Sequence, residues 1–144
     1  NKFPKKILKY DTINNKHKWF RDGYLNACYN VIDKNIINGL GKKIAITYLE
    51  ENGEFKEYTY NELLTIVSSL CTILKKKLHP RKKNLIMIHG STSIEINASM
   101  LAASRLGIHH CVVFRELSFE AIVQRIQLFK PSIIITKDND EKIK

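Results

Sequence analysis

Three short apolar runs in the second half of the chain decide the fold. They read Asn84-Leu-Ile-Met-Ile-His-Gly90, Ile108-His-His-Cys-Val-Val-Phe114 and Ser132-Ile-Ile-Ile-Thr-Lys137. Their centres are nearly continuous in apolar residues and rich in β-branched ones, which is typical of strands buried on both faces. We therefore predict three strands, over Leu85–Ile88, Cys111–Phe114 and Ile133–Ile135.

Two segments of helical length lie between these strands. Thr92–Leu106 and Ser118–Phe129 both place apolar residues at spacings of three and four, the pattern of a helix with one buried face. The order β-α-β-α-β predicts an α/β fold with a parallel sheet and right-handed crossovers. In such sheets ligands bind just beyond the carboxyl ends of the strands. Here those ends are His89-Gly90, Phe114-Arg115-Glu116 and Lys137-Asp138.

The first half of the chain is predicted to add a β-hairpin and a long helix. Lys43–Leu49 and Phe55–Tyr58 flank an Asn52-Gly53 turn, the strongest hairpin signal in the sequence. Thr59 is placed to cap a helix over Tyr60–Leu78, whose leucines recur at spacings of three and four. No Pro-rich or Gly-rich linker divides this region from the predicted sheet.

The amino-terminal residues show no sustained period, so we expect an irregular arm over 1–18 and one folded unit over 19–144. Four aromatic residues between Trp19 and Asn30 surround a Gly turn and are expected to pin the arm to the main body. A short helix is predicted over Val31–Leu40, with Ile32, Ile36 and Ile37 pointing inward.

Composition indicates a water-soluble globular domain. The chain has 144 residues, 44% hydrophobic and 26% charged, and no apolar run of the roughly 20 residues that a bilayer span needs. Three cysteines without C-x-x-C spacing predict free thiols in a reducing, cytoplasmic compartment. The +10 net charge raises the alternative of nucleic-acid binding, which steep salt dependence would reveal. Lysines in runs at a helix end favour a solvated surface instead, so we expect no nucleic-acid partner.

Two further groups were weighed as ligand sites. His109 and Cys111 share one face of a predicted strand, but no carboxylate is spaced to join them, so we predict a packed pair and no metal. Gly90-Ser91-Thr92-Ser93 precedes a helix and is able to bind an anion on free N–H groups. Capping of the helix by Ser91 or Thr92 explains the same residues without a ligand, and we favour it.

A set of motifs resembles a known family. In order, they are Trp-Phe…Gly-x-Leu-Asn-x-x-Tyr-Asn (Trp19–Asn30), Asp33, Thr-Tyr-x-Glu-Leu (Thr59–Leu63), Arg-Leu-Gly (Arg105–Gly107), His-Cys-Val-Val-Phe (His110–Phe114) and Ser-x-Glu-Ala-x-x-x-Arg-Ile (Ser118–Ile126). Together they resemble the amino-terminal portion of acetyl-CoA synthetases and of the closely similar propionyl-CoA synthetases, which are adenylate-forming acyl-CoA ligases. The resemblance covers Trp19 to about Asp138.

The resemblance implies a two-step reaction in a longer protein. A carboxylate such as acetate or propionate and Mg-ATP give an acyl-adenylate and pyrophosphate, and the sulfur of CoA then displaces AMP. The phosphate loop, the adenylation motif, the ribose-binding Asp and the lid lie downstream in this family, so the ATP and Mg sites are expected outside these residues. We therefore expect no catalytic residue in this part of the protein, and no activity from it alone.

By the same resemblance, one part of the CoA site falls on this chain. The turn that lines the CoA pocket corresponds to Phe114-Arg115-Glu116, and an arginine that contacts CoA phosphates corresponds to Lys142. The family has Gly-Gly where this chain has Arg115-Glu116, and glycine allows a ligand to approach the backbone closely. We expect CoA binding to persist in modified form; the alternative is a non-catalytic interaction module with the same fold.

Overall fold

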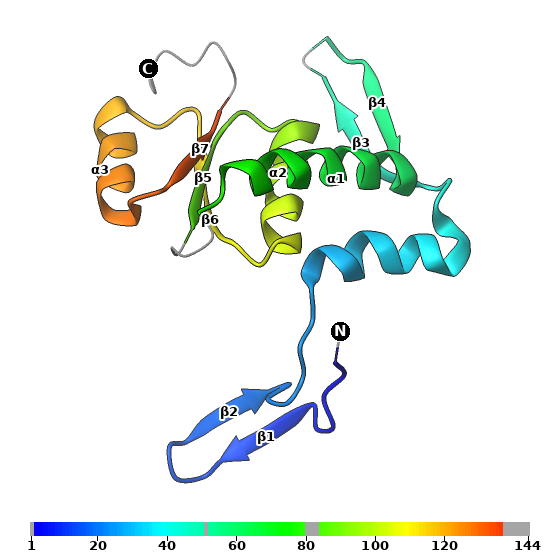
Figure 1. Ribbon diagram of the computed structural model, residues 1–144, viewed down its shortest axis with the longest axis vertical. Helices are drawn as coiled ribbons and strands as arrows, with labels where there is room; N and C mark the ends of the chain where they lie inside the picture. The colour runs from blue at the N-terminus through cyan, green and yellow to red at the C-terminus, as the bar shows by residue number, and fades with distance from the viewer. Residues whose placement is uncertain (1, 51, 80–83, 137–144) are drawn as a thin grey trace.

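The computed structural model describes residues 2–50, 52–79 and 84–136, and its centre is a three-stranded parallel sheet (Figure 1). The strands are β5 (Leu85–Gly90), β6 (His109–Phe114) and β7 (Ile133–Ile135), in the order β6-β5-β7. Met87 of β5 lies opposite Cys111 on one side and Ile134 on the other. The predicted α/β fold and parallel sheet are confirmed.

The helices after β5 and β6 cover opposite faces of this sheet. Ile86 and Ile88 pack in one core cluster with α1 (Tyr60–Lys77) and α2 (Ile94–Arg105). Met87 points the other way and packs with Ile122 of α3 (Phe119–Phe129). The central strand β5 is therefore buried on both faces, because successive side chains alternate across a strand.

The expected burial on both faces is wrong for β6. Val113 is buried against α3, but Val112 and Phe114 are exposed. Within the described residues β6 is an edge strand of the sheet, so its outer part has no neighbouring strand.

Each of the three α-helices begins at a side-chain cap. At α1, Thr59 and Glu62 form a reciprocal capping box, as the sequence predicted for Thr59. Ser118 caps α3 by accepting from the N–H of Ala121. At α2 the cap is Ser93, not Ser91 or Thr92: its Oγ accepts from the N–H of Ile96 at 3.3 Å. The predicted start of this helix was therefore one to two residues early.

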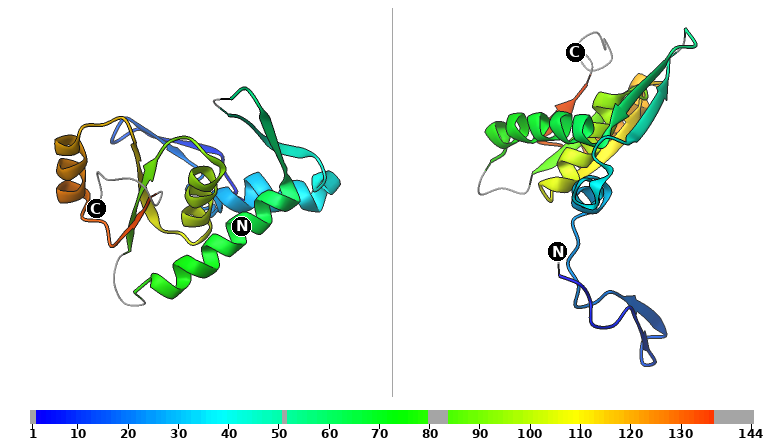
Figure 2. Two further views of the ribbon diagram at one scale, coloured as in Figure 1. Left: turned by 90° about the horizontal axis from the view of Figure 1, so that it is seen from above. Right: turned by 90° about the vertical axis from the view of Figure 1, so that its right-hand side faces the viewer.

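The predicted hairpin is present as β3 (Ile44–Leu49) and β4 (Phe55–Thr59), paired antiparallel. Gly53 in its turn has φ +84°, a conformation that glycine adopts without a Cβ penalty. Figure 2 shows the two strands leading into the amino-terminal end of α1 and standing out from the other elements.

The helix predicted over Val31–Leu40 forms from two π-helical turns, η1 (Tyr29–Asp33) and η2 (Ile36–Leu40). Ile32 is buried and Ile36 packs against the core, as predicted. Ile37 is exposed, so its inward placement was wrong. A π-helix bonds residues five apart rather than four, which rotates later side chains off the face that an α-helix would present.

The amino-terminal arm is not irregular. β1 (Leu8–Asp11) and β2 (Lys16–Trp19) pair as an antiparallel hairpin, which projects from the remaining elements (Figures 1 and 2). The expected boundary after residue 18 falls inside β2. The aromatic residues do not pin the arm to the body, because Trp19, Phe20 and Tyr24 are all exposed. No helix within the described ranges is both long and apolar enough to cross a membrane.

Candidate functional site

The three strands are parallel, but successive strands join the sheet on opposite sides of β5. From β5 the chain moves to one side to form β6 and then crosses back past β5 to form β7. The switch in the direction of winding therefore falls between β5 and β7, at their carboxyl ends. Ligands in open α/β sheets bind at such a switch point.

A cavity of about 820 Å³ lies at this place. It is lined from three sides, by the segment after β5, by residues at the ends of β6 and β7, and by the turn side of the β3–β4 hairpin. The lining residues are Tyr48, Glu50, Asn52, Gly90, Ser91, Thr92, Ser93, Glu95, Ile96, Arg115, Ile135 and Thr136. Of the predicted strand ends, Gly90 and Arg115 line this cavity, with Ile135 and Thr136 at the end of β7. His89 is buried beside the carbonyl of Val113, and Lys137-Asp138 lie outside the described residues.

The end of β5 and the segment after it line the cavity with small residues, Gly90, Ser91, Thr92 and Ser93. A Cβ built on Gly90 would lie 3.1 Å from Cδ1 of Ile96, so this position is filled tightly by its neighbour. Ser91 and Thr92 are exposed and present hydroxyl groups, whereas the Oγ of Ser93 is occupied by the first turn of α2. This end of α2 also directs backbone N–H groups outward, which favours negative charge nearby.

Charges of both signs border the cavity. Arg115, in the turn after β6, is the cation among the lining residues, and Glu50 and Glu95 are the carboxylates. Glu50 is paired with Lys56 on the neighbouring strand, 2.5 Å away, and this pairing raises the pKa of Lys56. Its negative charge is thus largely balanced within the hairpin. Hydroxyls, an amide and a guanidinium suit the binding of a polar or anionic group.

The predicted CoA residues are only partly brought to the cavity. Arg115 lines it. Phe114 and Glu116 are exposed in the same turn, which the N–H of Leu117 closes by donating to the carbonyl of Phe114 at 3.4 Å, but neither lines the cavity. Lys142 lies outside the described residues.

Neither His109 and Cys111 nor the Gly90–Ser93 segment belongs to a cluster of metal ligands among the described residues. In the ranges the structure describes, no three His, Cys, Asp or Glu side chains come together as a metal site would require. His109 is exposed at the start of β6, and Cys111 is half-buried with Met87 on the α3 side of the sheet.

Sequence reasoning missed the contribution of the β3–β4 hairpin. Tyr48, Glu50 and Asn52 reach the cavity although they precede β5 by 33 to 37 residues of chain. The alternating pattern predicted the hairpin itself, but nothing in that pattern tells which end of the sheet its turn adjoins.

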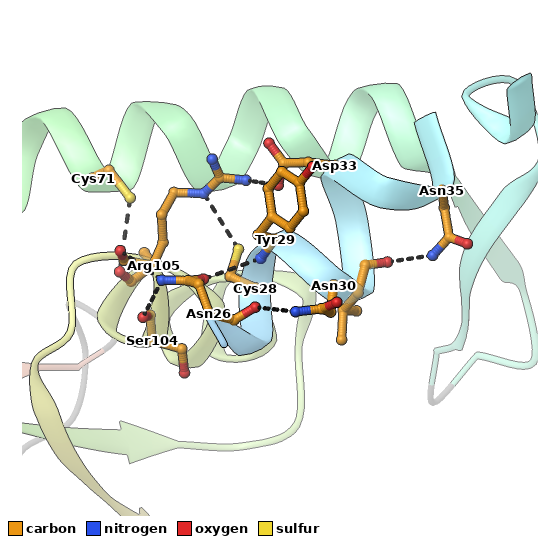
Figure 3. Close-up of polar contacts among 11 residues, drawn as sticks. Asn26, Cys28, Tyr29, Asn30, Asp33, Asn35, Cys71, Ser104 and Arg105 are labelled. Carbon is orange, nitrogen blue, oxygen red and sulfur yellow. Dashed lines mark hydrogen bonds and ion pairs between the residues drawn. The ribbon is translucent and has the colours of Figure 1, made fainter. Parts of the chain in front are cut away.

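A second polar cluster fixes the far end of α2 (Figure 3). The side-chain amide of Asn26 donates to the carbonyls of Ser104 and Arg105, at 3.1 Å each, and its oxygen accepts from the N–H of Tyr29 at 3.1 Å. It thereby satisfies carbonyls that a helix end leaves without intrahelical partners.

The side chain of Arg105 completes this cluster. Its guanidinium forms an ion pair with Asp33, and its Nε donates to the sulfur of Cys28 at 3.3 Å. Burial raises the pKa of the Cys28 thiol, so the sulfur stays protonated and neutral beside the ion pair. Cys71 of α1, whose thiol donates to the carbonyl of Ala102 at 3.8 Å, is also buried, and burial raises its pKa as well.

This cluster explains why three separate motifs occur together. The Trp19–Asn30 stretch and Asp33 meet the distant Arg105–Gly107 motif at one end of α2; Asp33 and Arg105 are 72 residues apart. The other end of α2 carries Ser93, Glu95 and Ile96 of the cavity wall. A twelve-residue helix is rigid, so what holds its carboxyl end also sets the orientation of its amino end.

Comparisons with known proteins identify the family to which the chain belongs. Residues 35–144 match the family described as AMP-binding enzyme. The chain is 39% identical over 120 residues to the acetyl-coenzyme A synthetase, chloroplastic/glyoxysomal, of Arabidopsis thaliana. This match covers 83% of this chain and 16% of that protein. It is 37% identical over 131 residues to the acyl-CoA synthetase short-chain family member 3, mitochondrial, of Homo sapiens. This match covers 87% of this chain and 19% of that protein.

A solved structure supports the same fold. The crystal structure of Brucella canis acyl-CoA synthetase superposes with a TM-score of 0.69 at 18% identity, over 83% of this chain and 21% of that one. The chain thus spans less than a fifth of the length of these two curated relatives, at 16% and 19%. The motif resemblance is confirmed: the chain belongs to the AMP-binding enzyme family, and within it the sequence is similar to acetyl-CoA synthetases.

Proposed function

We propose that residues 19–144 form part of the amino-terminal subdomain of an AMP-forming acetate–CoA ligase. The observation that supports this most is the 39% identity to a protein named as an acetyl-CoA synthetase. In the longer protein, acetate and ATP would give acetyl-AMP and pyrophosphate, and CoA would then accept the acetyl group. Sites for ATP and Mg would lie in other parts of that protein.

The role proposed for these residues is structural support and one wall of the CoA pocket. Arg115 carries the positive charge at the cavity, and a guanidinium is able to hold a phosphate through two parallel N–H groups. The resemblance would add Phe114, Glu116 and Lys142 to this wall, but Phe114 and Glu116 do not line the cavity and Lys142 lies outside the described residues. The Gly-Gly turn of the family is replaced by longer side chains here, so the CoA phosphates would contact Arg115 rather than bare backbone.

The reaction is tested by carboxylate-dependent ATP–pyrophosphate exchange on the natural full-length protein, with acetate and propionate side by side. Faster exchange with acetate is the expected result. Faster exchange with propionate would favour a propionyl-CoA synthetase. Absence of exchange from a folded protein would favour a non-catalytic module. The 144 residues alone are expected to show none.

The proposed CoA contact has its own test and a matched control. Arg115→Ala in the full-length protein is expected to weaken CoA binding about tenfold or more, since a charge-assisted hydrogen bond contributes on the order of 1.5–3 kcal/mol. Arg125→Ala removes the same charge from α3, where the guanidinium donates to the carbonyl of Ala121, and should leave CoA affinity unchanged. Equal CoA affinities for the Arg115→Ala and unaltered proteins would remove Arg115 from the site.

A cytoplasmic location remains a prediction. The relatives named above include chloroplastic or glyoxysomal and mitochondrial proteins, so similarity alone does not choose the compartment. Microscopy of the tagged full-length protein decides between the cytoplasm and an organelle.

A further inference from the structure

The hairpin of β1 and β2 has two chemically different faces. Its register sets Leu8 opposite Trp19 and Tyr10 opposite His17, so these four side chains share one face. The rings of Tyr10 and His17 are 5.0 Å apart, which agrees with that placement. All four are exposed; the exposed fraction is 58% for Trp19 and 47% for Tyr10. We call this set the aromatic face of the arm.

The opposite face is basic. It carries Lys9, Lys16 and Lys18 with Asp11, which pairs with Lys18. Residues 2–24 as a whole contain seven Lys and Arg against two Asp, a formal charge of +5, which is half of the +10 of the entire chain. A sixth of the residues thus carries half of the net charge, on an element that projects from the core (Figure 1).

The hairpin lacks the support that a stable two-stranded ribbon requires. An isolated pair of strands is marginal in water, and stability comes from a third strand or from packing on another layer. Among the described residues, backbone bonds between Lys2 and Tyr24 and between Ile7 and Phe20 close the arm on itself and do not attach it to another layer. Eight large apolar side chains of the arm are exposed: Phe3, Ile7, Leu8, Tyr10, Ile13, Trp19, Phe20 and Tyr24. Of these, Leu8, Tyr10 and Trp19 lie together on the aromatic face, and exposed apolar side chains gathered on one face are typical of a binding surface.

A second copy of this chain fits the surface poorly. Two arms meeting face to face would bring two +5 segments together, and like charges in an interface are costly. The rest of a longer polypeptide fits better. The family match begins at residue 35. The match to the human relative covers 87% of this chain, so it includes residues before 35. That relative is about five times as long as this chain.

We propose that the aromatic face of the arm docks on another part of the same polypeptide, outside these 144 residues, at a patch that is apolar in its centre and acidic at its rim. Trp19 and Tyr10 fill the apolar centre, and the lysines of the arm pair with carboxylates around it. This inference rests on the proposed function only in requiring the longer protein, and it does not require catalytic activity.

The test is zero-length carbodiimide crosslinking of the full-length protein, read by mass spectrometry. An equal mixture of unlabelled and isotope-labelled protein separates crosslinks within a chain from those between copies. The expected result is intrachain crosslinks from Lys9, Lys16 or Lys18 to acidic residues beyond Lys144. Mixed-isotope crosslinks would assign the surface to a second copy, and the absence of crosslinks from these lysines would mean that the arm is uncovered; both overturn the proposal.

Two variants and one further measurement sharpen this test. Trp19→Ser removes the largest side chain of the aromatic face and should reduce the intrachain crosslinks several-fold. Ile13→Ser removes an exposed apolar residue in the turn, off that face, and should leave them unchanged. In the unaltered protein, oxidation of Trp19 by hydroxyl radicals should be several-fold slower than after unfolding. A protein with these crosslinks but no pyrophosphate exchange would refute the proposed function alone.

Discussion

Replacing Asn26 by alanine tests whether the cluster in Figure 3 holds the carboxyl end of α2. The change removes two hydrogen bonds to the carbonyls of Ser104 and Arg105 and one from the N–H of Tyr29. The first two satisfy carbonyl groups at a partly buried helix end, at about 1 kcal/mol each. The third has the geometry of a helix amino-terminal cap, for which loss of the side chain costs about 1 kcal/mol. We expect Asn26→Ala to lower the free energy of unfolding by about 2–3 kcal/mol.

Asn35→Ala is the matched control from the same segment. Its amide donates one local bond, to the carbonyl of Val31 at 2.6 Å. Alanine has the higher helix propensity, by about half a kcal/mol, which offsets much of that loss. The net change is expected to stay within about 0.5 kcal/mol.

Urea unfolding followed by far-ultraviolet circular dichroism measures both variants against the unaltered chain. A clear drop in the midpoint for Asn26→Ala, with the slope unchanged and the control near the original midpoint, is the expected outcome. Equal midpoints for the two variants would show that the bonds from Asn26 to α2 contribute no more than a local helical bond. The idea that this cluster orients α2 would then be wrong.

Two further predictions concern titratable groups. Burial raises the pKa of the Cys28 and Cys71 thiols, so a disulfide reagent at mildly alkaline pH should label half-buried Cys111 quickly and the other two slowly; three equal rates would contradict the packing described. The hydrogen bond from the side chain of Lys18 holds the pKa of the Asp11 carboxyl well below its usual value. The ionised Asp11 carboxylate therefore stabilises the fold above about pH 4, and this stabilisation is lost as the pH falls through the folded-state pKa. Carbon-13 NMR titration should show this low pKa, and Lys18→Met should return it toward the ordinary range; an unchanged value in the variant would rule out Lys18 as the cause.

The parts of the fold that were predicted correctly are those in which the sequence pattern allows only one local structure. β5 is buried on both faces, and its unbroken run Leu85–Ile88 predicted this directly. The hairpin of β3 and β4 follows from Asn52-Gly53, because that pair adopts turn conformations that other residues resist. Thr59 caps a helix, as predicted, because a short hydroxyl side chain reaches the N–H three residues on.

The parts predicted wrongly depend on competing local choices or on tertiary contacts. Ser91, Thr92 and Ser93 are all able to cap α2, and only the path of the chain leaving β5 selects Ser93. Ile37 left the expected face because the helix winds as a π-helix there. In the arm, apolar or aromatic residues alternate with charged ones in β1 and β2, but the strands are short and rich in lysine. The alternation is recognised only from the strand pairing, which places Leu8 opposite Trp19.

The candidate site was predicted in position but not in composition. Arg115 follows from the rule that ligands bind beyond the carboxyl ends of parallel strands. The hydroxyl-bearing segment before α2 was considered for anion binding, and it lines the cavity. Tyr48 and Glu50 were missed, because the approach of a hairpin to a sheet depends on packing between elements distant in sequence.

The strand order β6-β5-β7 also bears on how the chain folds as it leaves the ribosome. One edge of β5 pairs soon with β6, but the other waits for β7: Ser132, which bonds to Leu85, comes 47 residues later. At roughly 5–20 residues per second, this delay lasts on the order of several seconds. During that time the apolar edge of Ile86, Met87 and Ile88 is open to wrong pairing. A pause in translation after β6 would prolong the exposure, so the stretch encoding α3 is where slow codons would most increase misfolding.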